Sequence, residues 1–491
     1  FWRNLDDNQK QAQVNITIPF LQEKSAANKI KLGGLYSKKD RLYTEDFFSL
    51  VFPSQQPDSY MPFGGTDNLG DFYSKSNFGI LSINENRLGT TKYYEFGNLI
   101  KYQSRTDGSN NNNYSGYEEI SALYAMVTFN LTERLKITAG ARFEITEMES
   151  ISDEYNVRIG DTTLIGPVKE WREIDGQFQQ VTVKSRDEAV ADYLKELDSE
   201  LIGRISEKDI LPALNATYEL TEDMNVRASY SKTIARPNMR EMSPYVSASF
   251  IGGPTLIGNP GLVKSDITNL DFRYEWYFNP GELFALSAYY KKFEDPIVQY
   301  FIPVSADVEL SYGNAGDGKV RGLELEFRKD LDFINALKNF SIGTNFSFIK
   351  SEMGLVIDSV GLVKGEDKDL FLKNPDNTKL ERPFYGQSPY LININLNYSS
   401  EFFDGSLSYN QFGPRLQRAG GGKAPDIFEE SEGNLNFNSK FKFERFSVGL
   451  SVKNILNSPV KWTQSLGNEK VNAVRYNTGT TYGITLSYNI N

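Results

Sequence analysis

Hydrophobic and polar residues alternate strictly along much of the chain. The segment 269–278 (NLDFRYEWYF) has an apolar or aromatic residue at every even position and a polar or charged residue at odd positions up to Glu275. The segments 391–398 (LININLNY) and 481–490 repeat this pattern. A period of two residues is that of a β-strand with one apolar face. The sequence therefore predicts an all-β protein built from two-faced strands.

The same template, applied to all 491 residues, predicts about fifteen strands. They lie near 11–20, 29–50, 117–130, 133–148, 209–221, 224–236, 266–278, 282–298, 319–331, 338–353, 388–400, 404–418, 431–443, 446–456 and 479–491. Short polar turns such as 130–134 and 279–282 alternate with long connections such as 51–116, 149–208 and 354–387. This layout is typical of a transmembrane antiparallel β-barrel, with short periplasmic turns and long extracellular loops. The spacing of apolar residues in 187–205 predicts an amphipathic helix within one loop.

Composition favours the barrel over the alternatives. Hydrophobic residues make up 39% of the chain and charged residues 24%, and no uninterrupted apolar run approaches the length of about 18 residues expected of a membrane-spanning helix. A soluble propeller would repeat every 40–45 residues or so, and no such repeat is visible. Aromatic residues gather beside the short turns, where an interfacial girdle would lie: Phe129, Tyr218, Trp276, Phe278, Tyr398 and Phe443.

Charge and residue content exclude several kinds of chemistry. The chain contains no cysteine and no histidine, which excludes disulfides, thiolate nucleophiles and metal sites built from these residues. Its formal net charge of -11 argues against a nucleic-acid partner. We expect no catalytic residues, no metal and no cofactor.

In a barrel, the polar face of each strand lines the lumen. Candidates for lumen-lining or plug-facing residues are Arg142, Glu144, Arg227, Asp271, Arg273, Glu275, Glu324, Glu326 and Arg328. Because both signs occur, we do not expect this wall to select for one charge. Aromatic residues of the long connections are candidates for extracellular ligand contacts, namely Tyr245, Phe250 and Tyr300. The alternative for these three is that they pack the loops together.

Four motifs occur in order along the chain: SYSKTIARPNMREMSP (229–244), GNPGL (258–262), GKVRGLELEFRKDL (318–331) and LSVKNILN (450–457). Each has a physical interpretation. A strand is expected to end at Arg236, before a proline that cannot donate to a ladder. The glycines and proline of 258–262 indicate a turn, Gly322 permits close approach of a bulky neighbour, and Asn454 is placed to bond backbone at the rim.

Together these motifs resemble the barrel of TonB-dependent receptors of the bacterial outer membrane, most closely those of Bacteroidota-type bacteria. The resemblance implies a barrel of about 22 strands around an N-terminal plug. Residues 1–491 would then be the barrel domain, supplying about fifteen strands. The plug, a TonB-binding segment and the first strands are expected upstream of Phe1. With an odd count, the first and last strands of the chain run in the same direction.

The resemblance also implies a function: active, TonB-dependent import of a scarce nutrient, such as a siderophore, glycan, peptide or vitamin, across the outer membrane. Expected partners are outer-membrane lipid, the nutrient, TonB through the upstream segment, and a surface lipoprotein. Two alternatives remain open, namely a passive outer-membrane channel and a receptor-like structural subunit of a larger outer-membrane complex.

Overall fold

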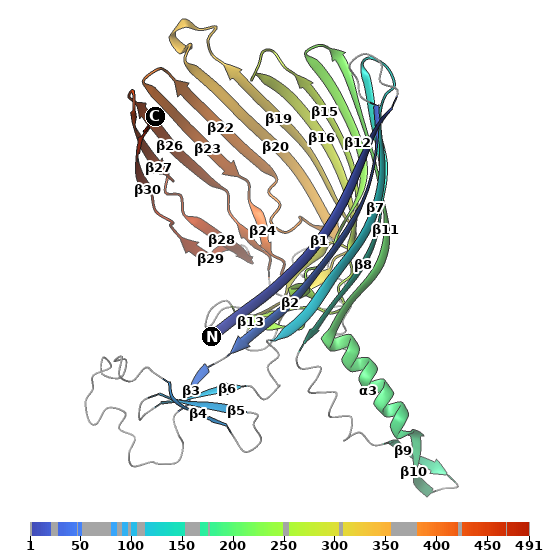
Figure 1. The fold of residues 1–491 in the computed structure, drawn as a ribbon. Helices are drawn as coiled ribbons and strands as arrows, with labels where there is room; N and C mark the ends of the chain where they lie inside the picture. Colours follow the sequence, from blue (N-terminus) through green and yellow to red (C-terminus); the bar gives the residue numbers. More distant parts are fainter. Residues whose placement is uncertain are drawn as a thin grey trace, which may run out of the picture.

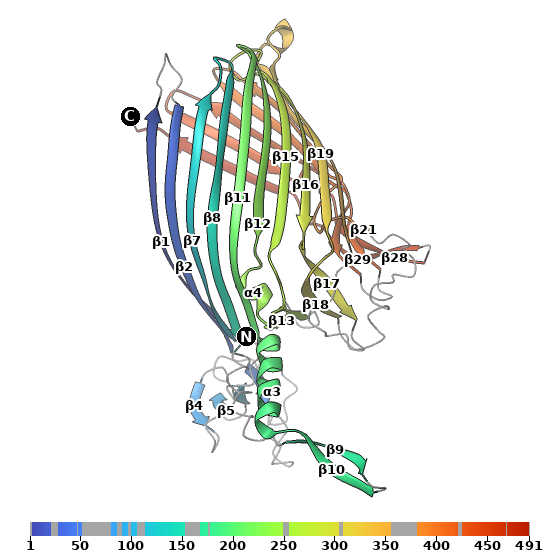
Figure 2. The same cartoon turned by 90° about the vertical axis from the view of Figure 1, so that its right-hand side faces the viewer.

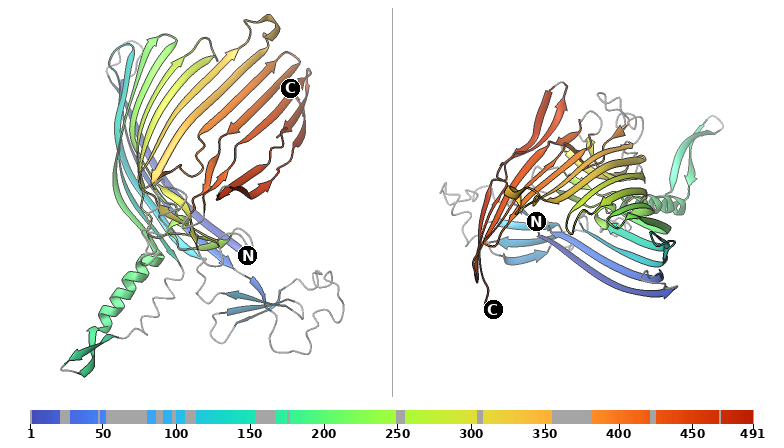
Figure 3. Two further views of the ribbon diagram at one scale, coloured as in Figure 1. Left: turned by 180° about the vertical axis from the view of Figure 1, so that it is seen from behind. Right: turned by 90° about the horizontal axis from the view of Figure 1, so that it is seen from above.

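The structure is a computed structural model, and it describes residues 2–20, 28–46, 48–51, 80–85, 91–96, 100–105, 113–152, 167–174, 177–248, 255–303, 308–354, 381–420, 425–467 and 469–490. Its main feature is one large antiparallel sheet in which fifteen strands follow one another in chain order, with the short strand β21 (Glu381–Arg382) pairing with β20. Seen from above, the sheet curves into an arc between β1 and β30 (Figure 3). The predicted all-β architecture is confirmed.

The fifteen strands are β1 (Trp2–Phe20), β2 (Asn28–Asp46), β7 (Tyr114–Asn130), β8 (Leu135–Ser152), β11 (Ile202–Thr221), β12 (Met224–Ala235), β15 (Ser265–Trp276), β16 (Leu283–Glu294), β19 (Gly318–Asp330), β20 (Phe340–Gly354), β22 (Tyr390–Ser399), β23 (Phe403–Phe412), β26 (Glu432–Lys442), β27 (Phe446–Lys453) and β30 (Thr481–Tyr488). Each matches one of the predicted strands. Because every pairing along this path is antiparallel and the count is odd, β1 and β30 run in the same direction.

The two ends of the sheet differ. At one end, at the top of Figure 1, the strands are joined by short turns, such as the one between β11 and β12. At the other end, which we call the loop end, smaller elements are inserted between the strands (Figures 1 and 2). They are β3 (Phe48–Val51), β4 (Ile80–Glu85), β5 (Thr91–Phe96), β6 (Ile100–Arg105), β9 (Val168–Ile174), β10 (Gln177–Lys184), α3 (Arg186–Leu201), α4 (Met239–Met242), β13 (Val246–Ala248), β14 (Thr255–Ile257), β17 (Ile297–Pro303), β18 (Val308–Asn314), β24 (Arg415–Arg418), β25 (Ile427–Glu429), β28 (Val460–Leu466) and β29 (Glu469–Tyr476). The short-turn end carries the 3-10 helix η2 (Asn335–Leu337).

Several predicted bounds were wrong at the loop end. Strand β1 begins at Trp2 instead of residue 11, and β11 begins at Ile202 instead of residue 209. Neither extension alternates: 6–11 (DDNQKQ) is polar on both faces, and 202–208 (IGRISEK) has one isoleucine on each face, so the template does not detect them. In the opposite sense, β23 ends at Phe412, and the rest of the predicted strand belongs to β24, which pairs with β25.

The predicted helix is confirmed as α3, with a different end. Ser185 and Glu188 form a capping box at its start, since each side chain accepts a hydrogen bond from the other residue's backbone N–H. Such a box satisfies two otherwise unpaired donors of the first turn. Leu197 and Leu201 are buried. The helix stops there because the following residues pair with β8 as the start of β11.

The sheet has two chemically distinct faces. We call the face that carries Leu270 and Phe272 the outer face, and the face that carries Arg273 and Glu275 the inner face. Leu270 and Phe272 are 47% and 49% exposed, whereas Glu275 is buried. Apolar side chains exposed to this extent on a regular face are unfavourable in water and favourable in lipid. No helix in the described part of the chain is long and apolar enough to cross a membrane.

Aromatic rings form contacts near the short-turn end, as the sequence predicted. The Trp276 and Phe278 ring centroids are 4.4 Å apart. Further ring pairs lie at this end, some between adjacent strands and some across an intervening strand: Phe20–Phe129, Phe278–Phe327, Phe340–Tyr398, Tyr398–Phe403, Phe403–Phe441 and Phe443–Phe446. A row of rings at one level of the sheet is typical of the boundary between hydrocarbon and head groups.

A pair of adjacent substitutions on β22 tests the assignment of the two faces. Ile392 belongs to the outer face and Asn393 to the inner face. We expect Ile392→Arg in the full-length protein to destabilise the folded state by about 2–4 kcal/mol, the range for an arginine facing lipid near the midplane. Asn393→Arg is the control and should change stability little. Urea unfolding in lipid vesicles measures both, and equal losses would contradict the assignment.

Candidate functional site on the inner face

A chain of alternating charges crosses the inner face from β12 to β19. The Nε atom of Arg227 lies 2.8 Å from Glu275 Oε2, and the Nε atom of Arg273 lies 2.8 Å from Glu275 Oε1. Arg273 also donates through Nη2 to Glu326 at 2.9 Å and through Nη1 to Ser287 at 2.9 Å. Arg328 is the last member of this series of ion pairs, with its Nη2 atom 2.5 Å from Glu326 Oε1. Five of the predicted lumen residues are thus in one network.

Strand register explains why Glu275 is needed between the two arginines. Arg227 and Arg273 are directly opposite each other in the pairing of β12 with β15. Like charges in this position repel each other. Glu275, two residues along β15, bonds both guanidinium groups. Because Glu275 is buried, its charge depends on these two partners.

Two other predicted residues share this face but stand outside the network. Asp271 accepts a hydrogen bond from the Ser229 hydroxyl at 3.3 Å. Glu324 is directly opposite Ser287 in the pairing of β16 with β19. The expectation for Gly322 is confirmed, because a Cβ atom there would lie 2.3 Å from the ring of Tyr289. The missing side chain lets that ring lie across β19.

A second, smaller cluster lies nearer the loop end. Arg142 donates from Nε to Glu144 at 2.5 Å, and Arg236 donates to the other oxygen of the same carboxylate. Strand β12 ends one residue before Arg236, as expected from the following proline. No sequence pattern indicates that Arg236 bonds to Glu144, since 92 residues separate them. Beside this cluster, Lys264 forms an ion pair with the buried Asp209.

The inner face changes character from β20 onward. Its side chains there are mainly uncharged, and eight asparagines are drawn from four adjacent strands: Asn345, Asn393, Asn395, Asn397, Asn410, Asn434, Asn436 and Asn438. Asn410 donates to Asn393 at 2.7 Å, while the buried Oδ1 atom of Asn434 has no partner in the described part of the chain. These amides are not among the predicted lumen residues, which are all charged, although LININLNY displays three of them at alternate positions.

At the loop end, an apolar cluster covers part of the inner face. It contains Tyr114, Met148, Met239, Met242 and Leu262, together with Tyr245, which is 4% exposed. The Tyr245 hydroxyl lies 2.7 Å from the hydroxyl of Tyr43. Tyr245 therefore packs the loops in this structure, in line with the alternative given for it.

The other loop aromatics show the same trend. Tyr300 packs against a second cluster that includes Val298 and Leu416. Tyr312 packs against the first cluster, and burial raises the pKa of its hydroxyl. Phe250, the third ligand-contact candidate, lies outside the described residues.

The GNPGL motif holds the loop cluster in place. Asn259 donates from its side chain to the carbonyl of Tyr312 at 2.8 Å and accepts from the backbone of Gly261 at 2.8 Å. A Cβ atom on Gly258 would lie 1.7 Å from the carbonyl oxygen of Ser243. The expected turn is thus also a point where two loop segments touch. Asn454, as expected, bonds backbone, donating to the carbonyl of Gly479 at 2.9 Å.

The chemistry available on this face is that of binding. The described residues contain no group of three or more metal-ligating side chains. Paired charges and amides offer donors and acceptors to a hydrated solute or to a polar protein surface. Their arrangement across adjacent strands makes a continuous polar wall.

Residues 1–455 match the family described as TonB dependent receptor-like, beta-barrel. Solved structures with a similar fold include the ferric yersiniabactin uptake receptor FyuA from Yersinia pestis, with 13% identity, a TM-score of 0.51 and coverage of 99% of this chain and 55% of that one. The unliganded ferric citrate transporter FecA has 13% identity, a TM-score of 0.52 and coverage of 99% and 55%. The copper transporter OprC has 10% identity, a TM-score of 0.54 and coverage of 99% and 57%.

The chain spans little more than half the length of these three proteins. At such low identity the likeness shows the fold alone. Among curated proteins, none matches the sequence.

Removing one carboxylate tests the charge network. We expect Glu275→Gln in the full-length protein to destabilise it by about 1–3 kcal/mol, since two arginines lose a buried partner. Asp271→Asn on the same strand and face is the matched control and should change stability by about 0.5 kcal/mol or less. Urea unfolding in vesicles compares the two. If the variants were equally stable, the network would contribute nothing.

Adding a single methyl group tests the loop contact. Gly258→Ala should displace the segment around Asn259 from Ser243, because the new Cβ would overlap a carbonyl oxygen. We expect faster protease cleavage within residues 236–264, with the sheet still folded. Gly343→Ala, where nothing lies within 4 Å of the added atom, should leave the cleavage rate unchanged. An equal rate in both variants would refute the contact.

Proposed function

The chain belongs to the family of TonB-dependent receptor-like β-barrels, and on that basis we propose that the full-length protein imports a scarce nutrient across the outer membrane by a TonB-dependent route. The family consists of outer-membrane receptors and transporters, and its members are located in the bacterial outer membrane. The observation that carries the proposal is the two-faced sheet. An exposed apolar outer face suits lipid, and a continuous polar inner face suits the passage or binding of a hydrated solute.

Residues 1–491 are proposed to be the C-terminal part of the barrel domain. The edges of the main sheet at β1 and β30 are each paired on one side only within the described part of the chain. Unpaired backbone groups in hydrocarbon cost several kcal/mol each. Further strands between these edges would satisfy them, giving a barrel of about 22 strands.

A lumen of that width would leak unless a plug filled it. The inner face is suited to contact a plug because it presents polar groups in two regions of different chemistry. The charged region around Glu275 and Glu326 would contact a plug surface of mixed charge. The amide region would contact a neutral polar surface. TonB would engage a segment preceding the plug by β-strand addition.

The nutrient is proposed at the level of class only: a siderophore, glycan, peptide or vitamin. The structural relatives are named for ferric yersiniabactin, ferric citrate and copper, so one fold serves solutes of different chemistry. Selection would therefore reside in the loop end and not in the sheet. A surface lipoprotein is a further proposed partner there. We propose no enzymatic activity.

Uptake measurements in intact cells test the proposal. Accumulation of the nutrient should require both this protein and TonB, and the purified full-length protein should show little steady conductance in planar bilayers. Deletion of TonB in cells that still produce the protein is the control for energy coupling.

The alternative functions give different results. TonB-independent uptake with a large steady conductance would replace the proposal with a passive channel. Unchanged uptake on deletion of the gene, with stable co-purification in a larger complex, would replace it with a structural subunit.

A further inference from the structure

Five strands at one side of the sheet, β1, β2, β7, β8 and β11, are longer than the others and project beyond them at the loop end (Figures 1 and 2). The backbone pairing of β11 with β12 ends at Ala213 and Ser231, whereas its pairing with β8 continues to Ile202. Pro212 stands where the pairing with β12 stops, and a proline has no N–H to donate to a ladder. Beyond this point the five strands form what we call the projecting wall. In the described part of the chain, no strand covers its edge at β11.

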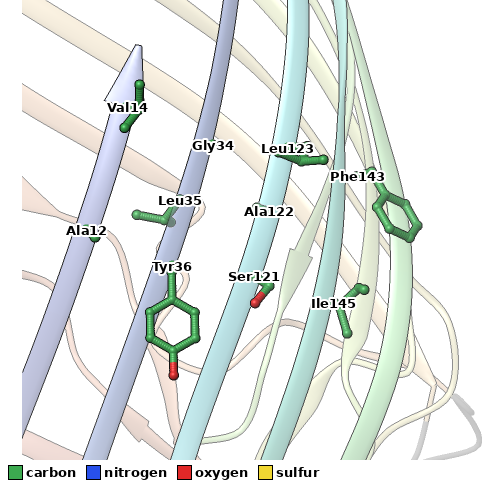
Figure 4. A pocket seen from close by; sticks show the side chains of 10 residues that line it. All are labelled: Ala12, Val14, Gly34, Leu35, Tyr36, Ser121, Ala122, Leu123, Phe143 and Ile145. Atoms are coloured by element: carbon green, nitrogen blue, oxygen red, sulfur yellow. The ribbon is translucent and has the colours of Figure 1, made fainter.

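The projecting wall begins where the apolar band of the outer face ends. Val14 and Phe143 line an apolar groove within this band, and the groove extends along β8 as far as Ile145 (Figure 4). The next outer position on β8 is occupied by Glu147, so the band stops there. Inner-face residues of β8 from Glu144 onward, and the β11 residues opposite them, therefore lie at the mouth of the barrel.

The connection between β12 and β15 lies across the inner face of the projecting wall. We call its described parts, 236–248 and 255–264, the strap. Its helix α4 packs on β8 and β11. The Ser150 hydroxyl donates to the carbonyl of Met239 at 3.0 Å, and a Cβ atom on Gly203 would lie only 2.8 Å from a side-chain atom of α4. The strap and the wall are therefore in direct contact.

The strap reaches beyond these two strands. The hydroxyl of Tyr245 lies 2.7 Å from that of Tyr43 on β2, and Leu262 is buried in the same apolar cluster. The two sections of the strap are joined by Asn259, whose backbone N–H donates to the carbonyl of Glu241 at 2.6 Å. The strap thus spans from β12 to β2, which is four strands away in the sheet.

Both ends of the strap are fastened to the same place on the projecting wall. Arg236 at its start forms an ion pair with Glu144, and Lys264 at its end forms one with Asp209. Glu144 and Asp209 are directly opposite each other in the pairing of β8 with β11, and each is 5% exposed. Because buried carboxylates depend on cationic partners, these two ion pairs stabilise the closed position of the strap.

The contact between strap and wall is incompletely hydrogen-bonded. In the described part of the chain, eight buried side-chain atoms have no hydrogen-bond partner. Four of them belong to the strap or to the wall beneath it: Thr146 Oγ1, Asp209 Oδ2, Arg236 Nε and Ser243 Oγ. Such groups give up hydrogen bonds to water without a replacement. Closure is thus favoured by the ion pairs and opposed by the unpaired groups.

We propose that the strap is a movable closure of the barrel mouth, which opens when the ion pairs of Arg236 with Glu144 and of Lys264 with Asp209 break. In the open position the strap remains joined to β12 and β15, and water reaches the inner face of β8 and β11 and hydrates the unpaired groups. The mouth is then wider on this side by the space that the strap occupies. The closure depends neither on the chemistry of the nutrient nor on TonB.

Thiol modification of the full-length protein tests the closure. This chain contains no cysteine, so Ser150→Cys introduces one reporter beneath α4, at a position that is fully buried. We expect it to react slowly with a charged maleimide, and about ten-fold faster when Glu144→Gln or Asp209→Asn is added. Ser347→Cys, at a buried position on the inner face of β20, is the matched reporter outside the strap. Its reaction rate should not change.

Two further comparisons separate the strap from a general effect. Glu118→Gln makes the same charge change on the inner face of β7 and should leave the Ser150→Cys rate unchanged. Arg236→Gln combined with Glu144→Gln should react no faster than Glu144→Gln alone, because both substitutions break one ion pair. A Ser150→Cys rate that no substitution changes would overturn the proposal. So would an equal increase at Ser347→Cys, because that result would indicate a general loosening of the barrel.

Discussion

The structure depends on the pairing of backbone hydrogen bonds between neighbouring strands. In hydrocarbon, an N–H or C=O group has no water to bond, so each strand must be satisfied by the strands beside it. In the described part of the chain, fifteen strands paired in chain order give each inner strand a neighbour on both sides, and β1 and β30 form the two edges. Once the backbone is satisfied in this way, side chains alternate between two faces. The apolar outer face and the polar inner face both follow from that alternation.

The inner face shows how the alternation produces interactions that no single strand contains. Register places Arg227 opposite Arg273, and Glu275 then bonds both. Farther along the sheet the same rows carry asparagine instead of charge. The wall is therefore divided into a region held together by its own ion pairs and a region rich in uncharged amides. A solute or a plug inside the barrel would contact both regions, so the division of the wall would determine these contacts more than any single residue.

The sequence predicted the strands well and the contacts poorly, for a physical reason. Alternation reports directly on a strand with one apolar face, so all fifteen strands were found, and charges such as Arg273 lie on the face opposite the apolar residues of their strand. The extensions of β1 and β11 at the loop end carry no such signal, because their apolar residues do not alternate. The pairing of Arg236 with Glu144 depends on loop geometry, and the burial of Tyr245 depends on a cluster assembled from several loops. Periodicity within a segment contains no information about either.

Collision accessibility of spin labels along β15 tests the central claim, the two-faced sheet, most directly. The chain contains no cysteine, so single cysteines can be introduced in turn at positions 269 to 276 of the full-length protein and labelled in lipid vesicles. Accessibility to oxygen should alternate with a period of two residues and reach maxima at Leu270, Phe272 and Tyr274. Accessibility without alternation, or with maxima at Asp271 and Arg273, would contradict the account.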